Sequence, residues 1–151
     1  MIKILFICHG NICRSPMAEF IMRDMAEKSG VADKFYIESA AVSSEEIGNP
    51  VHSGTKRILN RMSIDCSKKC ARKMTRNDYE EFDLIVAMDR SNIRLLNYII
   101  GTDDEEKVKL LLDYTNRGGE VADPWYTGDF EQTLQDITDG CTAILNEYKG
   151  D

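Results

Sequence analysis

One short stretch near the start of the chain constrains its fold more than any other feature. Residues 2–7 are apolar apart from Lys3 and rich in isoleucine, which predicts a short buried β-strand. The stretch Cys8-His9-Gly10-Asn11-Ile12-Cys13-Arg14-Ser15 follows directly, and Gly10 and Asn11 are residue types that adopt positive φ at low cost. The chain is therefore expected to leave the strand in a tight loop that turns successive backbone N–H groups inward.

The residues after this loop predict a helix over residues 16–29. Ser15 is a preferred N-cap and Pro16 a preferred first helical residue, and apolar side chains then recur at helical spacing until Gly30. A helix N-terminus and a curled loop both present unpaired N–H groups, so their junction is expected to bind an anion. Arg14 adds a guanidinium that can hold a tetrahedral dianion through two parallel hydrogen bonds.

Cys8 stands at the mouth of this expected anion site. Inward N–H groups, a helix N-terminus and Arg14 all stabilise a thiolate, so Cys8 is expected to lose its proton readily. A thiolate that faces a bound phosphorus is a nucleophile, and the hydroxyl of Ser15 can donate to the same sulfur when it leaves. The spacing predicts phosphoryl transfer through Cys8. The alternative is a buried cysteine in an ordinary strand-to-helix turn.

Length and charge narrow the class of protein. The 151 residues are enough for one domain over residues 1–151 with a sizeable core. A net charge of −7 argues against nucleic acid or an anionic membrane surface as the partner. The apolar start ends at Cys8, too early for a secretory leader, and no run reaches the about 18 apolar residues of a membrane helix. With an odd number of cysteines, five, the protein is expected to be cytoplasmic with reduced thiols. A monomer is expected, with weak dimerisation left open.

Strands and helices are expected to alternate along the rest of the chain. Apolar runs predict further strands over residues 35–42, 83–88 and 107–114, and helical periodicity predicts helices over residues 54–62, 91–100 and 130–148. Asp129 and Gln132 have the spacing of a capping box at the start of the last helix. The order predicts an α/β fold, a three-layer αβα sandwich around a four-stranded parallel sheet. In such sheets a ligand binds at the carboxyl ends of the strands, where the Cys8 loop also lies.

A second chemical element lies between the last expected strand and the last helix, at Asp123-Pro124-Trp125-Tyr126. Transfer of a phosphoryl group to a thiolate expels an alkoxide or phenoxide, and a carboxylic acid at the rim can protonate it. Asp123 is the best candidate for this acid, although Asp-Pro is also an ordinary turn dipeptide. Trp125 and Tyr126 are expected to form an aromatic wall for a flat leaving group.

With both motifs at this separation, the sequence resembles the low-molecular-weight protein tyrosine phosphatases over nearly its whole length. The resemblance includes Glu38-Ser39-Ala40, Ile47-Gly48-Asn49-Pro50, and Val86-Ala87-Met88-Asp89. It implies a flavodoxin-like fold of the phosphotyrosine protein phosphatase I type and hydrolysis of phosphotyrosine in proteins, with inorganic phosphate as the product. It also implies that no metal and no organic cofactor is used.

The resemblance assigns roles to the residues of the motifs. It implies a cysteinyl-phosphate intermediate on Cys8, phosphate held by Arg14, and Asp123 as general acid and then general base. It implies that Ser39 and Asp89 support the loop from other strands. The remaining residues of the loop would bind phosphate or hold the loop in shape, and they are His9, Gly10, Asn11, Ile12, Cys13 and Ser15.

Cys13 is a candidate redox partner of Cys8. Two cysteines on one curled loop can approach closely enough for a disulfide, which would protect Cys8 from irreversible oxidation. The family uses its matching cysteine in this way. A small residue that only fills the loop is an equal alternative.

The sequence departs from the family at the rim and behind the loop. Lys69 falls in the region where eukaryotic members have a loop-supporting histidine. Trp125 follows Asp-Pro where tyrosine is common. Glu45 and Glu46 are expected to lie at the substrate rim and to disfavour acidic substrates.

Other functions were weighed against these residues. Thioredoxin-coupled arsenate reductases need two further cysteines after the third strand, where Met88 and Asp89 stand, although Cys66 and Cys70 have the spacing of a redox pair. Protein arginine phosphatases are expected to carry threonine in place of Ile12, and a phosphocarrier needs neither an arginine nor an acid. A zinc site is set aside because the spacings of Cys8, His9, Cys13, Cys66 and Cys70 are not those of zinc knuckles.

Overall fold

A parallel four-stranded sheet forms the middle layer of the protein. The computed structural model describes residues 1–150. The strands lie in the order β2-β1-β3-β4, and all three neighbouring pairs are parallel. Their bounds are Ile2–Cys8 for β1, Phe35–Ala41 for β2, Leu84–Ala87 for β3 and Val108–Leu110 for β4. The predicted four-stranded parallel sheet is confirmed.

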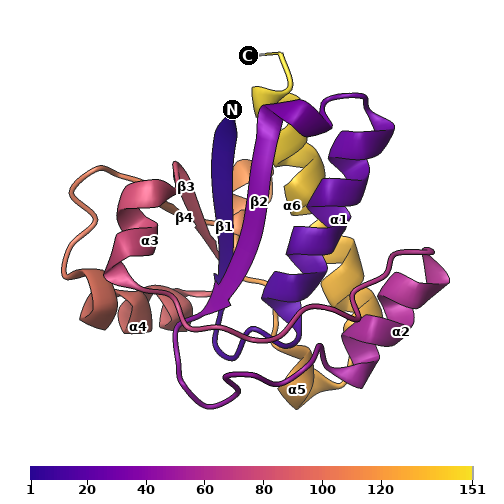
Figure 1. Ribbon diagram of the computed structural model, residues 1–151, viewed down its shortest axis with the longest axis horizontal. Helices are drawn as coiled ribbons and strands as arrows, with labels where there is room; N and C mark the ends of the chain where they lie inside the picture. The colour runs from indigo at the N-terminus through magenta and orange to yellow at the C-terminus, as the bar shows by residue number, and fades with distance from the viewer. Residues whose placement is uncertain (151) are drawn as a thin grey trace.

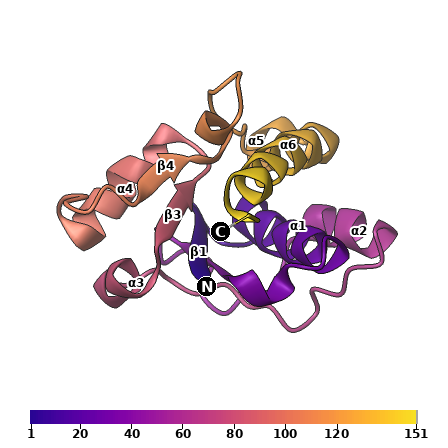
Figure 2. The same ribbon diagram turned by 90° about the horizontal axis from the view of Figure 1, so that it is seen from above.

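Helices cover both faces of this sheet (Figures 1 and 2). Helices α1, α2 and α6 lie on one side, and α3 and α4 lie on the other. The helices are α1 (Arg14–Lys28), α2 (Ser53–Arg61), α3 (Arg76–Glu81), α4 (Arg90–Ile100), α5 (Pro124–Thr127) and α6 (Phe130–Tyr148). Two 3₁₀ turns are η1 (Ala32–Lys34) and η2 (Leu111–Tyr114). The three-layer αβα sandwich expected from the sequence is therefore present. None of the helices among residues 1–150 is long and apolar enough to cross a membrane.

The central strand β1 explains why its sequence is almost continuously apolar. Ile4 and Phe6 belong to the core between the sheet and helices α1 and α6, whereas Leu5 and Ile7 belong to the core against α3 and α4. All four side chains have no exposed surface. A strand covered on both faces must be apolar at every position, and this distinguishes β1 from a half-exposed strand.

The strand order places the candidate loop. The chain leaves β1 through α1 to β2 on one side, and it later adds β3 on the other side of β1. At this change of direction the loops that follow β1 and β3 diverge, which leaves a crevice at their carboxyl ends. Cys8 ends β1, and Asp89 lies two residues after the end of β3, so the topology brings both to this crevice.

The expected strand over residues 107–114 is wrong beyond its first half. Only Val108–Leu110 pairs with β3, and Leu111–Tyr114 forms the 3₁₀ turn η2. A short apolar run does not show by itself whether it is strand or turn. The tertiary reason lies in α6, where a Cβ on Gly140 would meet Leu111 at 2.3 Å, so the helix and η2 pack in a contact that only glycine permits.

Two expected helix starts also differ in detail. Helix α1 begins at Arg14, so Ser15 lies inside the helix and does not cap it. At α6, Asp129 accepts from the backbone N–H of Gln132 at 3.0 Å, but the Gln132 side chain donates to Asp136 and not back to Asp129, so the expected capping box is only half formed. In both places the side chain makes another contact instead of the expected cap. Ser15 contacts Cys8, and Gln132 donates to Asp136. The sequence reading also left out the short helix α3.

Candidate active site

The loop between β1 and α1 is tightly curled, as the sequence predicts, but not at both expected residues. Asn11 has a φ of 59°, the left-handed conformation that asparagine tolerates. Gly10 does not have positive φ. A Cβ at Gly10 would lie 3.1 Å from Cγ of Glu46, so this glycine allows the neighbouring loop to approach.

The thiol of Cys8 is buried at the base of this loop. The backbone N–H of Asn11 donates to its Sγ at 3.3 Å, and Ser15 Oγ lies 3.0 Å from the same sulfur. Only 3% of Cys8 is exposed. Two donors therefore face the sulfur, the arrangement that stabilises a thiolate.

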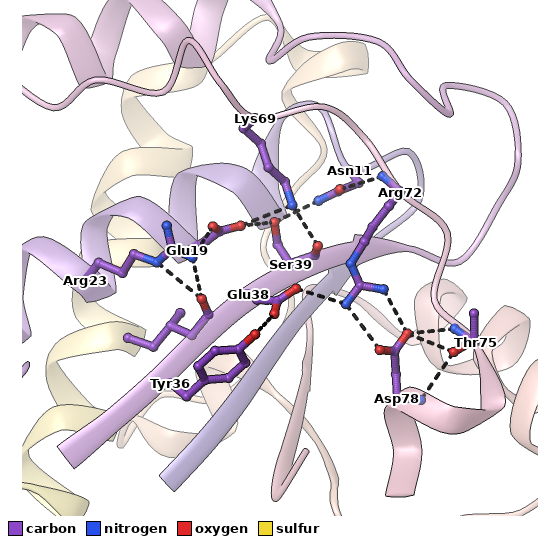
Figure 3. Close-up of polar contacts among 11 residues, drawn as sticks. Asn11, Glu19, Arg23, Tyr36, Glu38, Ser39, Lys69, Arg72, Thr75 and Asp78 are labelled. Atoms are coloured by element: carbon purple, nitrogen blue, oxygen red, sulfur yellow. Dashed lines mark hydrogen bonds and ion pairs between the residues drawn. The ribbon is translucent and has the colours of Figure 1, made fainter. Parts of the chain in front are cut away.

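A relay of hydrogen bonds connects this sulfur to a buried carboxylate behind the loop, and Figure 3 shows its part from Asn11 to Glu19. Asn11 Nδ2 donates to Ser15 Oγ at 2.8 Å. It also donates to Ser39 Oγ at 2.9 Å. Ser39 Oγ donates in turn to Oε1 of Glu19 at 2.5 Å. The backbone N–H of Arg72 donates to Asn11 Oδ1 at 3.2 Å, which assigns the orientation of the Asn11 amide.

The relay has one direction, and its start is the charge on Glu19. An ionised carboxylate only accepts, so the Ser39 hydroxyl must point its hydrogen at Glu19 and accept from Asn11. Asn11 also donates to the oxygen of Ser15, and the hydroxyl hydrogen of Ser15 is then left for the sulfur of Cys8. Through Ser39 and Asn11, the network thus orients the Ser15 hydroxyl toward the Cys8 sulfur.

Two cations neutralise Glu19. Lys69 Nζ lies 3.3 Å from its Oε1 and also donates to the backbone carbonyl of Ser39 at 2.9 Å, and Arg23 Nη2 lies 2.8 Å from its Oε2 (Figure 3). Lys69, which falls in the region where eukaryotic members of the family are expected to carry a histidine, therefore contacts the loop support directly. The sequence reading missed Glu19. A carboxylate on the helix that packs against the sheet was the available signal, since a buried charge requires a partner.

Further ion pairs hold the segment that supplies the Arg72 N–H (Figure 3). The Arg72 guanidinium pairs with Asp78 at 2.9 Å and with Glu38 at 3.3 Å. Asp78 also closes a capping box with Thr75 at the start of α3. These contacts fix the loop after α2 beside the end of β2, and so they fix the donor that orients Asn11.

Arg14 is the most deeply buried cation of the site, with 2% of its surface exposed. Its Nη1 donates to Asp89 Oδ2 at 2.7 Å and to the carbonyl of Val121 at 2.9 Å, and its Nη2 lies 3.3 Å from Asp123 Oδ2. Burial acts to lower the pKa of Arg14, but the surrounding negative groups, Cys8 first, raise it above its usual value. Burial acts to raise the pKa of Asp89, but the hydrogen bond and charge of Arg14 hold it below the ordinary 3.8.

A cavity of about 130 Å³ lies over the Cys8 sulfur. The loop residues form its floor, and Asp123 enters from the N-terminus of α5, where it accepts from the N–H of Trp125 at 3.1 Å. The structure brings together nearly all residues named from the sequence, and those lining the cavity are Cys8, His9, Gly10, Ile12, Cys13, Arg14, Glu45, Glu46, Asp123, Trp125 and Tyr126. Asn11, Ser15 and Asp89 lie behind this lining and contact Cys8 or Arg14, and Ser39 lies one step further back, where it contacts Asn11.

The rim carries both acidic and aromatic side chains. His9 Nε2 lies 2.8 Å from Glu45 Oε2. Trp125 packs edge-on against His52, whose ring stacks on Phe130 with the centroids 5.3 Å apart. His52 also caps α2, where its Nδ1 accepts from the N–H of Gly54, and its ring supports the aromatic rim.

The other cysteines differ from Cys8 in their surroundings. Burial, followed by the charges of Cys8 and Asp123, raises the pKa of Cys13 to about 12, so its thiol is neutral at physiological pH. Cys66 is buried in the core and Cys70 is exposed next to Pro50. All five thiols are free. Within residues 1–150 no group of three or more histidine, cysteine, aspartate or glutamate side chains is arranged to hold a metal ion.

The comparisons with known protein families, curated proteins and solved structures all indicate the same family. The chain matches the family described as low molecular weight phosphotyrosine protein phosphatase over residues 3–151. The low molecular weight protein-tyrosine-phosphatase YfkJ of Bacillus subtilis is 45% identical over 147 residues, which cover 96% of this chain and 94% of YfkJ. The crystal structure of YfkJ has a TM-score of 0.94 at 43% identity and covers 99% of this chain and 96% of that one.

Two further solved structures are similar. The low molecular weight protein tyrosine phosphatase SP-PTP of Streptococcus pyogenes has a TM-score of 0.87 at 41% identity, with 98% of this chain and 93% of that chain covered. A drosophila arginine phosphatase, DARP, has a TM-score of 0.88 at 29% identity, with 99% of both chains covered.

Proposed function

Because this chain belongs to the low molecular weight phosphotyrosine protein phosphatase family and is therefore a protein-tyrosine-phosphatase, we propose that it hydrolyses phosphotyrosine through a cysteinyl-phosphate intermediate on Cys8. The observation that carries the proposal is the single cavity in which Cys8, Arg14 and Asp123 meet. A nucleophile, a cation for the phosphoryl oxygens and an acid for the leaving group are what this two-step reaction requires.

In the first step the Cys8 thiolate attacks phosphorus. The S–P bond forms while the bond from phosphorus to the tyrosyl oxygen breaks, and the electron pair of that bond goes to the leaving oxygen. The carboxylic acid of Asp123 gives its proton to this oxygen, so tyrosine leaves as a neutral phenol. The donors from Asn11 and Ser15 hold the sulfur in place before the attack.

Arg14 is suited to hold the phosphoryl group throughout. Its two Nη1 hydrogens are committed to Asp89 and Val121, and one Nη2 hydrogen faces Asp123. The remaining donors on Nε and Nη2 form one edge of the guanidinium, the geometry that binds two oxygens of a phosphoryl group. The fixed Nη1 end prevents rotation, so the arginine is preorganised for the charge that develops on the equatorial oxygens.

In the second step water hydrolyses the intermediate. The Asp123 carboxylate, left by the first step, takes a proton from water as its oxygen attacks phosphorus. The S–P bond breaks and its electron pair returns to sulfur, where the Ser15 hydroxyl stabilises the thiolate. Inorganic phosphate is released and the enzyme is restored. Every step uses the chain's own side chains.

Cys13 is not suited to be the nucleophile. It lines the same cavity, but its pKa of about 12 keeps it protonated. We propose that it instead traps oxidised Cys8 in a disulfide. Residues 1–151 acting as one domain, a monomer in solution and a cytoplasmic location stay predictions.

Hydrolysis of phosphoarginine is the second candidate, favoured by the similarity to DARP. The apolar Ile12 in the cavity wall favours an aromatic phosphoester instead. Peptides that carry phosphotyrosine, phosphoserine or phosphoarginine separate these functions when they are offered to the wild type without metal and with reductant. We expect turnover of phosphotyrosine only; preference for phosphoarginine would keep the mechanism and overturn the substrate.

The Cys8→Ser variant tests the nucleophile. We expect turnover to be abolished while phosphate still binds, because the backbone N–H groups and Arg14 remain. Binding is measured by isothermal titration with inorganic phosphate. Residual turnover with Cys8→Ser would disprove the covalent route, and loss of both turnover and binding would indicate that the loop has collapsed.

A further inference from the structure

A groove of about 560 Å³ continues from the reaction cavity onto helix α4. Cavity and groove share the lining residues His9, Arg14, Asp123 and Tyr126, and Ser91, Arg94 and Tyr98 line only the groove. A phosphotyrosine in the cavity would therefore place the neighbouring residues of its own chain within reach of the groove. The cavity alone is too small to contact more than the phosphotyrosine side chain.

The groove contains a cation that is not used elsewhere in the structure. Arg94 is exposed, and the described part of the chain supplies it with no ion pair or hydrogen bond. By contrast, Arg90 on the same helix lies 3.9 Å from Glu120. The carboxylate of Asp89, which also lines the groove, is paired with Arg14 at 2.7 Å. Asp123, the second carboxylate of the groove, lies 3.3 Å from the same guanidinium. Within the described residues, the groove charge that has no partner and can meet a ligand is therefore that of Arg94.

The part of the cavity rim outside the groove has the opposite charge. Glu45 and Glu46 line the cavity but not the groove. Glu45 is largely exposed and pairs only with His9 among residues 1–150. An acidic side chain next to phosphotyrosine is repelled on the Glu45 side and attracted on the Arg94 side, so the charges orient a bound peptide along one direction.

Two aromatic rings also line the groove, those of Tyr98 and Tyr126. Tyr98 is 89% exposed and Tyr126 is 85% exposed, so both rings are free to contact a ligand. Tyrosine and arginine together are the residues that contribute most often to binding energy in protein recognition. The surface thus has the composition of a peptide-binding site and not that of an ordinary solvated helix face.

We propose that this groove binds the residues that flank phosphotyrosine in a protein substrate and selects acidic ones, with Arg94 as the specificity-determining residue. The occupant is a phosphotyrosyl segment with aspartate or glutamate near the phosphotyrosine. The proposal rests on the proposed phosphatase function and adds the class of substrate to it.

Three phosphotyrosyl peptides, identical except for flanking aspartate, alanine or lysine residues, test the groove. The wild type is expected to give the highest kcat/KM on the acidic peptide and the lowest on the basic one. In Arg94→Ala the ratio of acidic to neutral kcat/KM falls about two- to fivefold, the value of a solvent-exposed ion pair. Arg94→Lys keeps most of the preference, and Arg94→Glu reverses it in favour of the basic peptide.

A matched control is Arg76→Ala, which removes the same charge from an exposed residue of α3 that lines neither cavity nor groove. This variant should keep the wild-type ratio. The preference should also shrink between about 0.01 M and about 0.15 M salt, because the Debye length falls from about 30 Å to about 8 Å. The Arg76 control separates a local contact from the effect of net charge, and the salt dependence shows that the preference is electrostatic.

Several outcomes would overturn the proposal. An equal preference in wild type and Arg94→Ala, or an equal loss in Arg76→Ala, removes Arg94 from recognition. A preference that depends on enzyme concentration shows that a second copy of the chain occupies the groove, which also overturns it. Phenyl phosphate has no flanking residues and therefore reports on the phosphatase function alone. If it is not turned over, that function fails. Binding of the three labelled peptides to Cys8→Ser, measured by fluorescence anisotropy, then tests the groove separately.

Discussion

The substitution Lys69→Met tests whether the charges behind the loop position the reacting groups. Lys69 makes two contacts, at 2.9 Å to the carbonyl of Ser39 and at 3.3 Å to Glu19. Its side chain is only 12% exposed, so these contacts are little screened by solvent. Methionine keeps the unbranched apolar stem, one atom shorter, and removes the charge and the donors.

The loss of folding free energy depends on which partners Glu19 keeps after Lys69 is replaced. Breaking a buried ion pair and leaving one charge alone costs about 3–5 kcal/mol. Here Arg23 still neutralises Glu19 at 2.8 Å, so the loss is closer to one hydrogen bond to a charged group, about 1.5–3 kcal/mol. With a urea m-value of about 2 kcal/mol/M, the unfolding midpoint should fall by about 1 M.

The Lys69→Met change should also weaken phosphate binding, because it loosens the relay behind the loop. Ser39 holds Asn11, and Asn11 holds both Ser15 and the curled loop. If the loosened relay costs the net value of one neutral hydrogen bond, about 1 kcal/mol, the inhibition constant for inorganic phosphate rises about fivefold. Urea unfolding and competitive inhibition by phosphate measure the two effects separately.

Lys68→Met is the control, because Lys68 precedes Lys69, is exposed, and does not line the cavity over Cys8. It should change neither the midpoint nor the inhibition constant. Lys69→Met values that equal those of Lys68→Met would refute the reasoning from the contacts. A lower midpoint with unchanged phosphate affinity would refute the relay and leave only a stabilising ion pair.

Three further predictions concern the site itself. Asp123→Asn should slow hydrolysis of an unactivated aryl phosphate by about 10²–10⁴-fold, since its phenoxide must be protonated, and should slow an activated phenyl ester less. Equal losses on the two esters would point to positioning instead. Because the pKa of Asp89 lies below its ordinary 3.8, its pairing with Arg14 stabilises the fold fully above that value and is lost as the pH falls below it. The difference in unfolding free energy between wild type and Asp89→Asn should therefore shrink on acidification below pH 3.8, and a difference that grows would contradict this assignment. On the proposal that Cys13 traps oxidised Cys8 in a disulfide, peroxide inactivation of the wild type should be reversed by thiol and that of Cys13→Ala should not; equal recovery would end this protective role.

Much of the fold followed from local chemistry. A continuous apolar run predicted β1, because a strand buried on both faces has no place for polar side chains. Helical periodicity predicted α6, and it predicted the end of α4 at residue 100, after which Gly101 has a φ of 83°. The alternation of these elements then allowed few arrangements other than a parallel sheet with helices on both sides.

The errors arose where contacts outside the expected local motif decide the structure. Leu111 turns out of the expected strand because Gly140, far along the chain, leaves space for it. Serine is a preferred N-cap residue, but the hydroxyl of Ser15 lies between Asn11 and Cys8. Local propensities contribute a few tenths of a kcal/mol to about 1 kcal/mol per residue, so one buried tertiary contact is enough to override them.

For the candidate site, too, some features follow from the sequence and others only from the tertiary structure. The sequence by itself determined which chemistry is available, because a cysteine, an arginine and glycine and asparagine turn residues within one short loop limit it to binding and attacking an anion. Only the tertiary structure decided how these groups are held. The carbonyl that fixes Arg14 belongs to Val121, 107 residues away, and the charge that orients the relay belongs to Glu19. A side chain's chemical type is a property of its own residue, whereas its burial, partners and orientation are properties of the packed chain, and these make the thiol of Cys8 differ from that of Cys13.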